Sequence, residues 1–262
     1  MKYQRFIALG DSFTEGMCDE KRYGQYRGWA DRVADVMAAD QPGFQYANLA
    51  IRGKLLKQVI DDQLEPALEQ VIDKTTLISF HAGANDVIRP KYNPNLVLPL
   101  YSQAVRKIAA SGATVMLFTV LEDSGKEGRL AESWKQRFKD FNENVRKVAA
   151  EVGAILCDGN QEESLKDPRF LAFDRLHLNP MGHDRVAQAV LETIDLPFDP
   201  GWRTPLEPAE PTSKIVQTGV TTLWFVTFAL PWLWRRARGK SSGDGRSCKY
   251  PHAIKWPLTH LD

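Results

Sequence analysis

Cysteine is scarce in this chain of 262 residues, which contains only Cys18, Cys157 and Cys248. An odd, sparse set without a CxxC pair fits a reducing compartment better than a disulfide framework. A chain of this length buries roughly 70–75% of its unfolded surface and needs no disulfide or metal to stabilise its fold. A long apolar run near the start is also missing, because only residues 6–9 are apolar before Gly10. That run is too short for a signal peptide, so we expect a cytoplasmic protein.

An excess of either charge sign is absent as well. Lys and Arg number 34, Asp and Glu number 33, and the formal net charge is +1. Without surplus positive charge the chain lacks the electrostatic footprint of a nucleic-acid-binding protein. Hydrophobic residues at 43% and charged residues at 26% are ordinary for a globular protein, which argues against a disordered or fibrous one.

Apolar runs and amphipathic segments alternate along the first 196 residues. Strands are expected at residues 6–9, 44–49, 75–80, 113–120 and 154–157. Helices are expected at residues 29–39, 54–72, 95–110, 131–152 and 180–194. Pro66 should kink or divide the second of these helices. The alternation predicts an α/β fold with a parallel sheet covered by helices on both faces, where sites lie at the C-terminal ends of strands.

The composition changes after residue 196. We assign residues 1–196 to one domain and residues 197–262 to a Pro-rich linker, a Trp-rich helix and a basic tail that do not form an independent domain. Residues 215–234 carry no charge, but their hydropathy is moderate and a basic cluster follows them. We therefore expect a helix that lies on the domain surface. Membrane contact through residues 215–238 is the alternative.

The first candidate motif is GDSFTEG at residues 10–16, directly after the first strand. It places Ser12 at the C-terminal end of that strand, between glycines that allow a tight turn. A serine at this position could be a nucleophile, or it could simply cap the next helix.

The second motif is DRLH at residues 174–177, just before the last helix of the domain. A separation of three residues in a turn brings Asp174 and His177 to one side. The carboxylate could then fix the tautomer of the imidazole and stabilise its protonated form. The alternative is a surface ion pair.

Two further loops could supply hydrogen-bond donors to a developing oxyanion. Asn85 follows the third strand in GAND at residues 83–86, and Gly53 follows the second strand in NLAIRG at residues 48–53. The alternatives are a turn and a glycine that only starts the next helix. Each motif is weak alone, but together they supply a nucleophile, a base, an orienting acid and oxyanion donors.

These four blocks, in this order, resemble the SGNH (GDSL-type) hydrolase superfamily over about residues 4–196. Phe13, which makes the first block GDSF rather than GDSL, departs from the family at a packing position. The tail, with Pro231-Trp232 and residues 238–246, looks like an extension found in a bacterial subset of these proteins.

The resemblance implies a three-layer α/β/α fold of the flavodoxin-like type with a five-stranded parallel sheet. It implies Ser12 as the nucleophile, His177 as its base and Asp174 as the partner of the histidine. It also implies an oxyanion hole formed by the Ser12 N–H, the Gly53 N–H and the Asn85 side chain. The predicted function is a serine esterase or acylhydrolase that cleaves an ester of a small acylated substrate through an acyl-enzyme, with no metal and no organic cofactor.

Two other functions stay open. An acyltransferase would use the same three residues, with an alcohol in place of water in the second step. A non-catalytic, membrane-associated binding protein would use the Trp-rich segment and the basic tail. The sequence leaves the oligomeric state open.

Four side chains near these loops are candidate substrate contacts: Asp11, Arg52, His81 and Arg89. Either arginine could bind a carboxylate or phosphate, with surface ion pairing as the alternative. Asp11 is expected instead to order its loop. His81 is expected to be a strand-end histidine whose ring is satisfied by the backbone.

Two more reactive residue types are interpreted as structural. His183 lies six residues after His177, a spacing that matches no zinc motif. Cys18 follows the serine loop, but no histidine or basic pair lies next to it in the sequence to activate the thiol.

Overall fold

A mostly parallel sheet runs through the centre of the computed structural model, which describes residues 3–122, 128–209, 213–238 and 241–258. Its parallel strands are β1 (Arg5–Gly10), β4 (Gln45–Asn48), β5 (Thr76–His81), β6 (Thr114–Phe118) and β7 (Ile155–Cys157). Their order across the sheet is β7-β6-β5-β1-β4. The five parallel strands predicted from the apolar runs are confirmed.

The strand order determines where loops can meet. From β1 the chain passes to β4 on one side of the sheet and then returns to β5 on the other side. The direction of winding therefore reverses at β1, which is where ligands bind in open parallel sheets. Gly10 pairs in register with His81, and Ala8 pairs with Asn48. The loops after β1, β4 and β5 consequently leave the sheet at the same edge.

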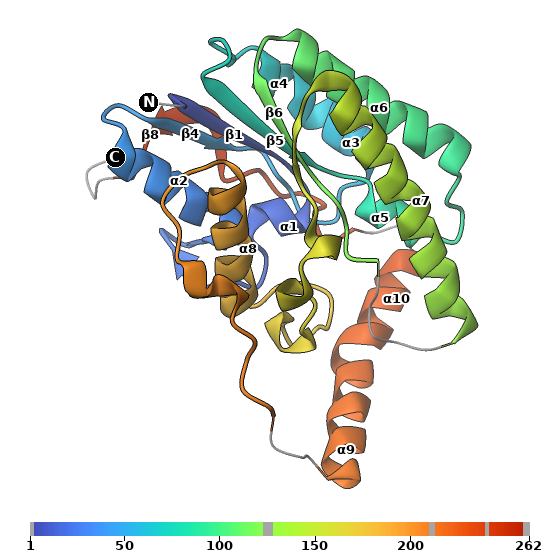
Figure 1. Cartoon of the computed structure of the whole chain (residues 1–262). Helices are drawn as coiled ribbons and strands as arrows, with labels where there is room; N and C mark the ends of the chain where they lie inside the picture. The colour runs from blue at the N-terminus through green and yellow to red at the C-terminus, as the bar shows by residue number, and fades with distance from the viewer. Residues whose placement is uncertain (1–2, 123–127, 210–212, 239–240, 259–262) are drawn as a thin grey trace.

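Helices cover both faces of the sheet and complete three layers (Figure 1). One face packs against α2 (Gly28–Asp40) and α8 (Pro180–Thr193). The other face packs against α6 (Pro94–Ala110) and α7 (Arg129–Val152), together with the helical residues 56–68. Trp29 and Phe141 are among the largest fully buried side chains of these two cores. Burial of the apolar helix faces is the main force that fixes this arrangement.

The helix after β4 is shorter and less regular than the expected residues 54–72. It consists of α3 (Leu56–Val59), the π-helix η1 (Ile60–Leu64) and α4 (Glu65–Leu68). Pro66 lies in the first turn of α4, where its missing N–H is accommodated by the widened turn before it. The proline thus produces a π-helical turn rather than a break.

A sixth strand, β8 (Tyr250–Lys255), runs antiparallel to β4 at the edge of the sheet. The expected sheet had only the five parallel strands, and β8 comes from the region interpreted as a basic tail. Trp256 packs on Tyr46 with ring centroids 5.0 Å apart. The Lys249 ammonium is buried against Asp31 at 2.6 Å. Pro251 is tolerated because an edge strand can lack one ladder donor.

Residues 214–237 form a continuous helical segment made of α9 (Lys214–Trp224), the π-helix η6 (Phe225–Ala229) and α10 (Leu230–Ala237). The sequence predicted a helix on the domain surface, but α9 projects away from the α/β body (Figure 1). Both faces of the sheet are already covered, so no apolar sheet surface is left to receive it. Within the described ranges, no helix is both long and apolar enough to cross a membrane.

The remaining elements are short. They are α1 (Ser12–Glu15), β2 (Lys21–Arg22), β3 (Gln25–Tyr26), α5 (Ala84–Val87), and the 3-10 helices η2 (Gly159–Gln161), η3 (Glu163–Leu165), η4 (Pro168–Phe170) and η5 (Pro200–Arg203).

Candidate active site

Ser12 is the first residue of α1, directly beyond the end of β1. Asp11 caps this helix, because its carboxylate accepts a hydrogen bond from the Phe13 N–H at 3.2 Å. Gly10 is required before it, since a Cβ at this position would lie 2.4 Å from the His81 carbonyl oxygen. The Phe13 ring packs 4.5 Å from His81 and 5.5 Å from Trp29 between centroids, which confirms that Phe13 occupies a packing position.

Ser12, His177 and Asp174 form a hydrogen-bonded series. His177 Nε2 lies 3.0 Å from Ser12 Oγ, and His177 Nδ1 lies 2.5 Å from Asp174 Oδ2. The other carboxylate oxygen, Oδ1, accepts hydrogen bonds from the His177 and Leu176 N–H groups at 2.9 and 3.0 Å. The structure thus brings together the three side chains that the sequence predicted.

The loop that carries Asp174 and His177 is held at both ends. Leu171 and Leu178 form an isolated antiparallel bridge across its base. Asn179 caps α8 by accepting from the Gly182 N–H at 3.0 Å, and its amide group donates to the Arg169 carbonyl at 2.7 Å. The start of the last helix of the domain, predicted at residue 180, is confirmed, since α8 begins at Pro180. The histidine is therefore positioned by a closed loop rather than by a free one.

Asp174 is electrostatically suited to remain ionised. Burial alone would raise the pKa of its carboxyl group, but the hydrogen bond and charge of His177, together with the two backbone N–H groups, hold that pKa below its usual value. A carboxylate at this place favours an imidazole that carries its proton on Nδ1 and exposes Nε2 to Ser12.

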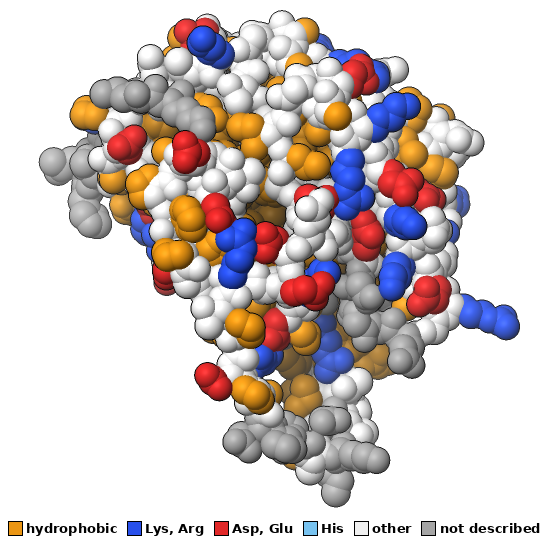
Figure 2. Space-filling view, viewed as in Figure 1, with side chains coloured by type: hydrophobic (Ala, Val, Ile, Leu, Met, Phe, Trp, Pro, Cys, Tyr) orange, Lys and Arg blue, Asp and Glu red, His pale blue; other side chains and the backbone are white. Residues whose placement is uncertain are grey.

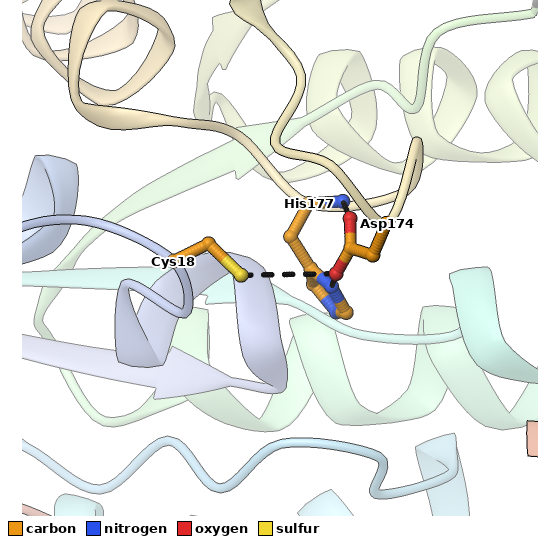
Figure 3. A group of neighbouring side chains, drawn as sticks. All are labelled: Cys18, Asp174 and His177. Atoms are coloured by element: carbon orange, nitrogen blue, oxygen red, sulfur yellow. Dashed lines mark hydrogen bonds and ion pairs between the residues drawn. The ribbon is translucent and has the colours of Figure 1, made fainter. Parts of the chain in front are cut away.

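Cys18 lies closer to these residues than the sequence suggested. Its Sγ is 3.7 Å from Asp174 Oδ2, the same carboxylate oxygen that lies against His177 Nδ1 (Figure 3). Burial, followed by the nearby Asp174 charge, raises the pKa of the thiol to about 12. The thiol therefore stays protonated and acts as a weak donor to the carboxylate. This agrees with the expected structural role, and only the contact with Asp174 was not foreseen.

Cys18, Asp174 and His177 place potential metal-ligand atoms within 4.8 Å of one another. However, the carboxylate and the imidazole already share a hydrogen bond of 2.5 Å, which a metal would have to separate. The thiol is protonated, whereas a zinc-binding cysteine is a thiolate. We therefore interpret this group as the acid and base of a hydrogen-bonded series rather than as a metal centre.

Arg52 is engaged inside the protein. Its Nε donates to Glu15 Oε1 at 2.9 Å, and its backbone N–H donates to Glu15 Oε2 at 2.6 Å. The guanidinium also lies 5.1 Å from the centroid of the Tyr26 ring. The expected alternative of ion pairing is thus found, but the pair is buried rather than on the surface. Because Glu15 ends α1, the pair fixes the loop of Gly53 to the helix of Ser12.

A turn from the C-terminal tail packs directly on Gly53. Ser241 Oγ donates to the Gly53 carbonyl at 3.1 Å. A Cβ on Gly53 would lie 2.4 Å from Ser241 Oγ, and a Cβ on Gly243 would lie 2.0 Å from the Arg52 carbonyl oxygen. Asp244 closes the turn by accepting from the Ser241 N–H at 2.8 Å. Two backbones therefore meet here at a distance that only glycine allows.

Asn85 lies at the start of α5, where its amide nitrogen donates to Asp11 Oδ2 at 3.0 Å and to the Lys54 carbonyl at 3.1 Å. The turn before it needs Gly83, because a Cβ there would lie 2.8 Å from the Phe141 ring. Asp86 accepts from the Leu56 N–H at 2.8 Å. Asp11 orders its loop, as expected, and Asp86 does the same, so that the two carboxylates connect the Asn85 loop to its neighbours.

The two remaining candidate contacts, His81 and Arg89, each have a buried nitrogen without a hydrogen-bond partner among the described residues. The expected backbone partner of His81 is not found: its buried Nδ1 has no hydrogen-bond partner among the described residues, and it lies 3.8 Å from Asp11 Oδ1. The ring is held instead between Phe13 and Phe118. Arg89 follows α5, and its buried Nε also has no partner within the described ranges.

His183 is buried behind the serine loop, with Nε2 3.1 Å from the Met17 carbonyl oxygen. Burial lowers its pKa to about 4, with Asp19 opposing and Arg32 and Lys249 supporting the shift. Between this value and the unfolded value near 6.5, the unfolded chain binds more protons than the folded one. The contribution of His183 to the free energy of unfolding should therefore be fully present above about pH 6.5. It should fall by on the order of 3 kcal/mol as the pH drops to about 4.

Chemical denaturation at several pH values measures this effect. The His183→Gln variant should show a shallower loss of stability between pH 6.5 and pH 4 than the unmodified protein. His252→Gln, at an exposed histidine of β8, is the matched control and should keep the original slope. An unchanged slope in His183→Gln would show that other groups cause the acid sensitivity.

Comparison with known proteins identifies relatives of the whole site region. The model of the GDSL-like lipase/acylhydrolase family matches residues 8–185. No curated protein sequence matches the chain. Among solved structures, the chain is similar to Axe2, an acetylxylan esterase from Geobacillus stearothermophilus, at 20% identity and a TM-score of 0.58 over 74% of this chain and 96% of Axe2.

Two further structures share the fold. TesA is 20% identical, with a TM-score of 0.57 over 73% of this chain and 98% of TesA. A lipolytic protein of the G-D-S-L family from Veillonella parvula is 22% identical, with a TM-score of 0.56 over 72% of this chain and 96% of that one. The family match includes Ser12, Gly53, Asn85, Asp174 and His177 and spans more than half of the chain. The chain therefore belongs to the GDSL-like lipase/acylhydrolase family of ester hydrolases.

Proposed function

We propose that this hydrolase is a serine esterase that cleaves an ester of a small acylated substrate through an acyl-enzyme on Ser12. The observation that carries the proposal is the hydrogen-bonded series from Asp174 through His177 to Ser12, with contacts of 2.5 and 3.0 Å. A serine hydroxyl is a weak nucleophile and needs a base within hydrogen-bond reach. The base in turn needs a third group that fixes its orientation, which is the role of Asp174.

The reaction proceeds in two halves. As Ser12 Oγ attacks the ester carbonyl carbon, His177 Nε2 takes the hydroxyl proton, and Asp174 stabilises the imidazolium. The tetrahedral intermediate then collapses, and the imidazolium gives its proton to the leaving alcohol. In the second half, water attacks the acyl group with His177 again as base. The acid leaves and the Ser12 hydroxyl is restored.

The oxyanion would be stabilised by the Ser12 N–H, the Gly53 N–H and the Asn85 amide. Neither backbone N–H donates to an acceptor within the described part of the chain. The Asn85 amide donates to the Asp11 carboxylate at 3.0 Å and to the Lys54 carbonyl at 3.1 Å. The oxyanion would replace the Lys54 carbonyl, because a charged oxygen is a stronger acceptor than a neutral carbonyl. Each such donor typically contributes 10²–10³ in rate, that is about 2.7–4 kcal/mol.

The tail turn on Gly53 gives a testable consequence for the oxyanion loop. In the Gly243→Ala variant, the new Cβ would lie 2.0 Å from the Arg52 carbonyl oxygen, so the turn or the loop must move. We expect kcat for a soluble acetyl ester to fall by about tenfold to a hundredfold, while KM changes little. This loss is a fraction of the rate enhancement that one oxyanion donor, here the Gly53 N–H, typically provides. Steady-state kinetics of the purified variant measure both quantities.

A matched glycine controls for substitution in the C-terminal region. Gly219 has open space around its Cβ position and ordinary helical backbone, so Gly219→Ala should keep the original kcat. Thermal unfolding of both variants shows whether the fold persists. If a folded Gly243→Ala protein kept full kcat, the turn would not position the oxyanion loop.

The proposed function is tested by hydrolysis of soluble p-nitrophenyl esters whose acyl chains increase in length from acetyl to octanoyl. Because Axe2 is described as an acetylxylan esterase, acetyl is the first acyl group to measure. We expect hydrolysis with kcat/KM highest for the shorter acyl chains. Absence of hydrolysis across the whole series, in protein shown to be folded, would contradict the proposal.

A further inference from the structure

The helical segment 214–237 exposes an apolar stripe to solvent. Val216, Val220 and Leu223 follow one another at intervals of four and three residues, so they share one side of α9. Their exposed fractions are 52%, 44% and 55%. Beyond the π-helical turn, Leu230 and Trp234 add two more exposed apolar side chains in α10, at 51% and 56%. This many exposed apolar side chains on one helical segment is more than the scattered apolar residues of an ordinary surface.

Charge along this segment has one sign. Residues 213–238 contain no Asp and no Glu, whereas the chain as a whole is balanced. Arg235 and Arg238 are exposed at its C-terminal end. The Arg238 guanidinium lies 3.8 Å from the centroid of the Trp234 ring, so a cation and an exposed indole are presented together. Figure 2 shows hydrophobic and basic side chains where the projecting helix joins the body, together with acidic side chains, which residues 213–238 do not contain.

The same helix is attached to the loop of Asp174 and His177. Trp224 Nε1 donates to the Asp174 carbonyl oxygen at 3.0 Å. The Arg175 guanidinium lies 4.9 Å from the Trp224 ring and donates to Thr221 Oγ1 at 3.2 Å. That loop has exposed apolar side chains of its own, Phe173 at 53% and Leu176 at 48%. A partner that binds to this helical segment would therefore lie close to the proposed active site.

From these observations we infer that residues 213–238 are a docking surface for the interface of an anionic lipid bilayer. Apolar side chains would enter the acyl boundary, Trp234 would lie at the headgroup level, and Arg235 and Arg238 would contact lipid phosphates. The absence of acidic residues gives the charge complementarity that a second copy of this chain, with the same positive surface, would lack. The inference goes beyond the proposed function, because the docking surface would place the proposed active site close to a bilayer whatever ester the enzyme cleaves.

Co-sedimentation of the full-length protein with vesicles tests the inference. Vesicles of phosphatidylcholine alone are compared with vesicles that also contain phosphatidylglycerol. We expect binding to the mixed vesicles, weaker binding to neutral ones, and a loss of binding as salt is raised. The Leu223→Asp variant should lower the partition coefficient at least about tenfold, the effect of no longer burying one leucine side chain. Arg235→Glu should weaken binding to anionic vesicles selectively.

Leu96→Asp is the matched control, because Leu96 is 68% exposed at the start of α6 and should not affect vesicle binding. Failure of the unmodified protein to bind mixed vesicles would overturn the inference. Equal binding by Leu223→Asp and Leu96→Asp would overturn it too, as would self-association through the helix without vesicle binding. Hydrolysis of soluble acetyl ester, measured in parallel, should be unchanged in all three variants. A lack of ester hydrolysis would count against the esterase proposal, whereas a lack of vesicle binding would count against the docking surface.

Discussion

Ser12→Ala should lower kcat/KM for a soluble acetyl ester by about 10⁴-fold or more, the largest effect expected of any single substitution in this chain. The hydroxyl that His177 Nε2 contacts at 3.0 Å would be gone, and no acyl-enzyme could form. Residual rate would come only from water attack assisted by the oxyanion donors. Steady-state hydrolysis with purified protein, free of contaminating esterases, measures the effect.

The matched control for this substitution is Ser247→Ala, at an exposed serine of the tail. It should retain the full rate. A Ser12→Ala protein that remains folded and hydrolyses the ester within tenfold of the unmodified enzyme would remove Ser12 from the role of nucleophile.

The second large effect is expected from Asp174→Asn, which should reduce kcat by about 10⁴-fold. An amide in place of the carboxylate can donate to His177 Nδ1, and it then stabilises the tautomer whose proton lies on Nε2. That tautomer cannot accept the Ser12 proton. The fold should be little changed, because the amide oxygen can still accept from the His177 and Leu176 N–H groups. Rate measurements over a pH series test the prediction.

Asp184→Asn provides the same chemical change at an exposed carboxylate of α8 and should leave kcat unchanged. Retention of more than a tenth of the activity in Asp174→Asn would mean that the carboxylate does not orient the base. Activity that recovers fully at high pH would instead point to a changed titration of the pair.

Much of the fold follows from local sequence patterns. The runs at residues 75–80 and 113–120 are apolar and β-branched, and both form buried parallel strands, β5 and β6. The strand β8 could not be predicted in this way, because Pro251 and His252 interrupt its pattern and its stability comes from distant partners. Lys249 pairs with Asp31 across 218 residues of sequence. Such pairing depends on tertiary contacts and leaves no local signal.

The same distinction between local patterns and long-range contacts applies to the candidate site. Ser12, Asn85, Asp174 and His177 could be predicted because each follows a strand or precedes a helix with a recognisable motif. The support around them could not. The buried Glu15–Arg52 pair, the Cys18 thiol beside Asp174 and the Ser241 turn on Gly53 all join segments far apart in the chain. The projection of α9 was also missed, because hydropathy shows an apolar stripe but not whether a complementary surface is free to cover it.

In the proposed function, Ser12 is the nucleophile, and His177 and Asp174 activate it. The most direct measurement is the intact mass of the protein after reaction with a fluorophosphonate, followed by mapping of the modified peptide. We expect one phosphonyl adduct per chain on Ser12, no adduct in Ser12→Ala, and a greatly slowed reaction in Asp174→Asn. A protein that hydrolyses esters but carries its adduct on another residue, or carries none, would contradict the account.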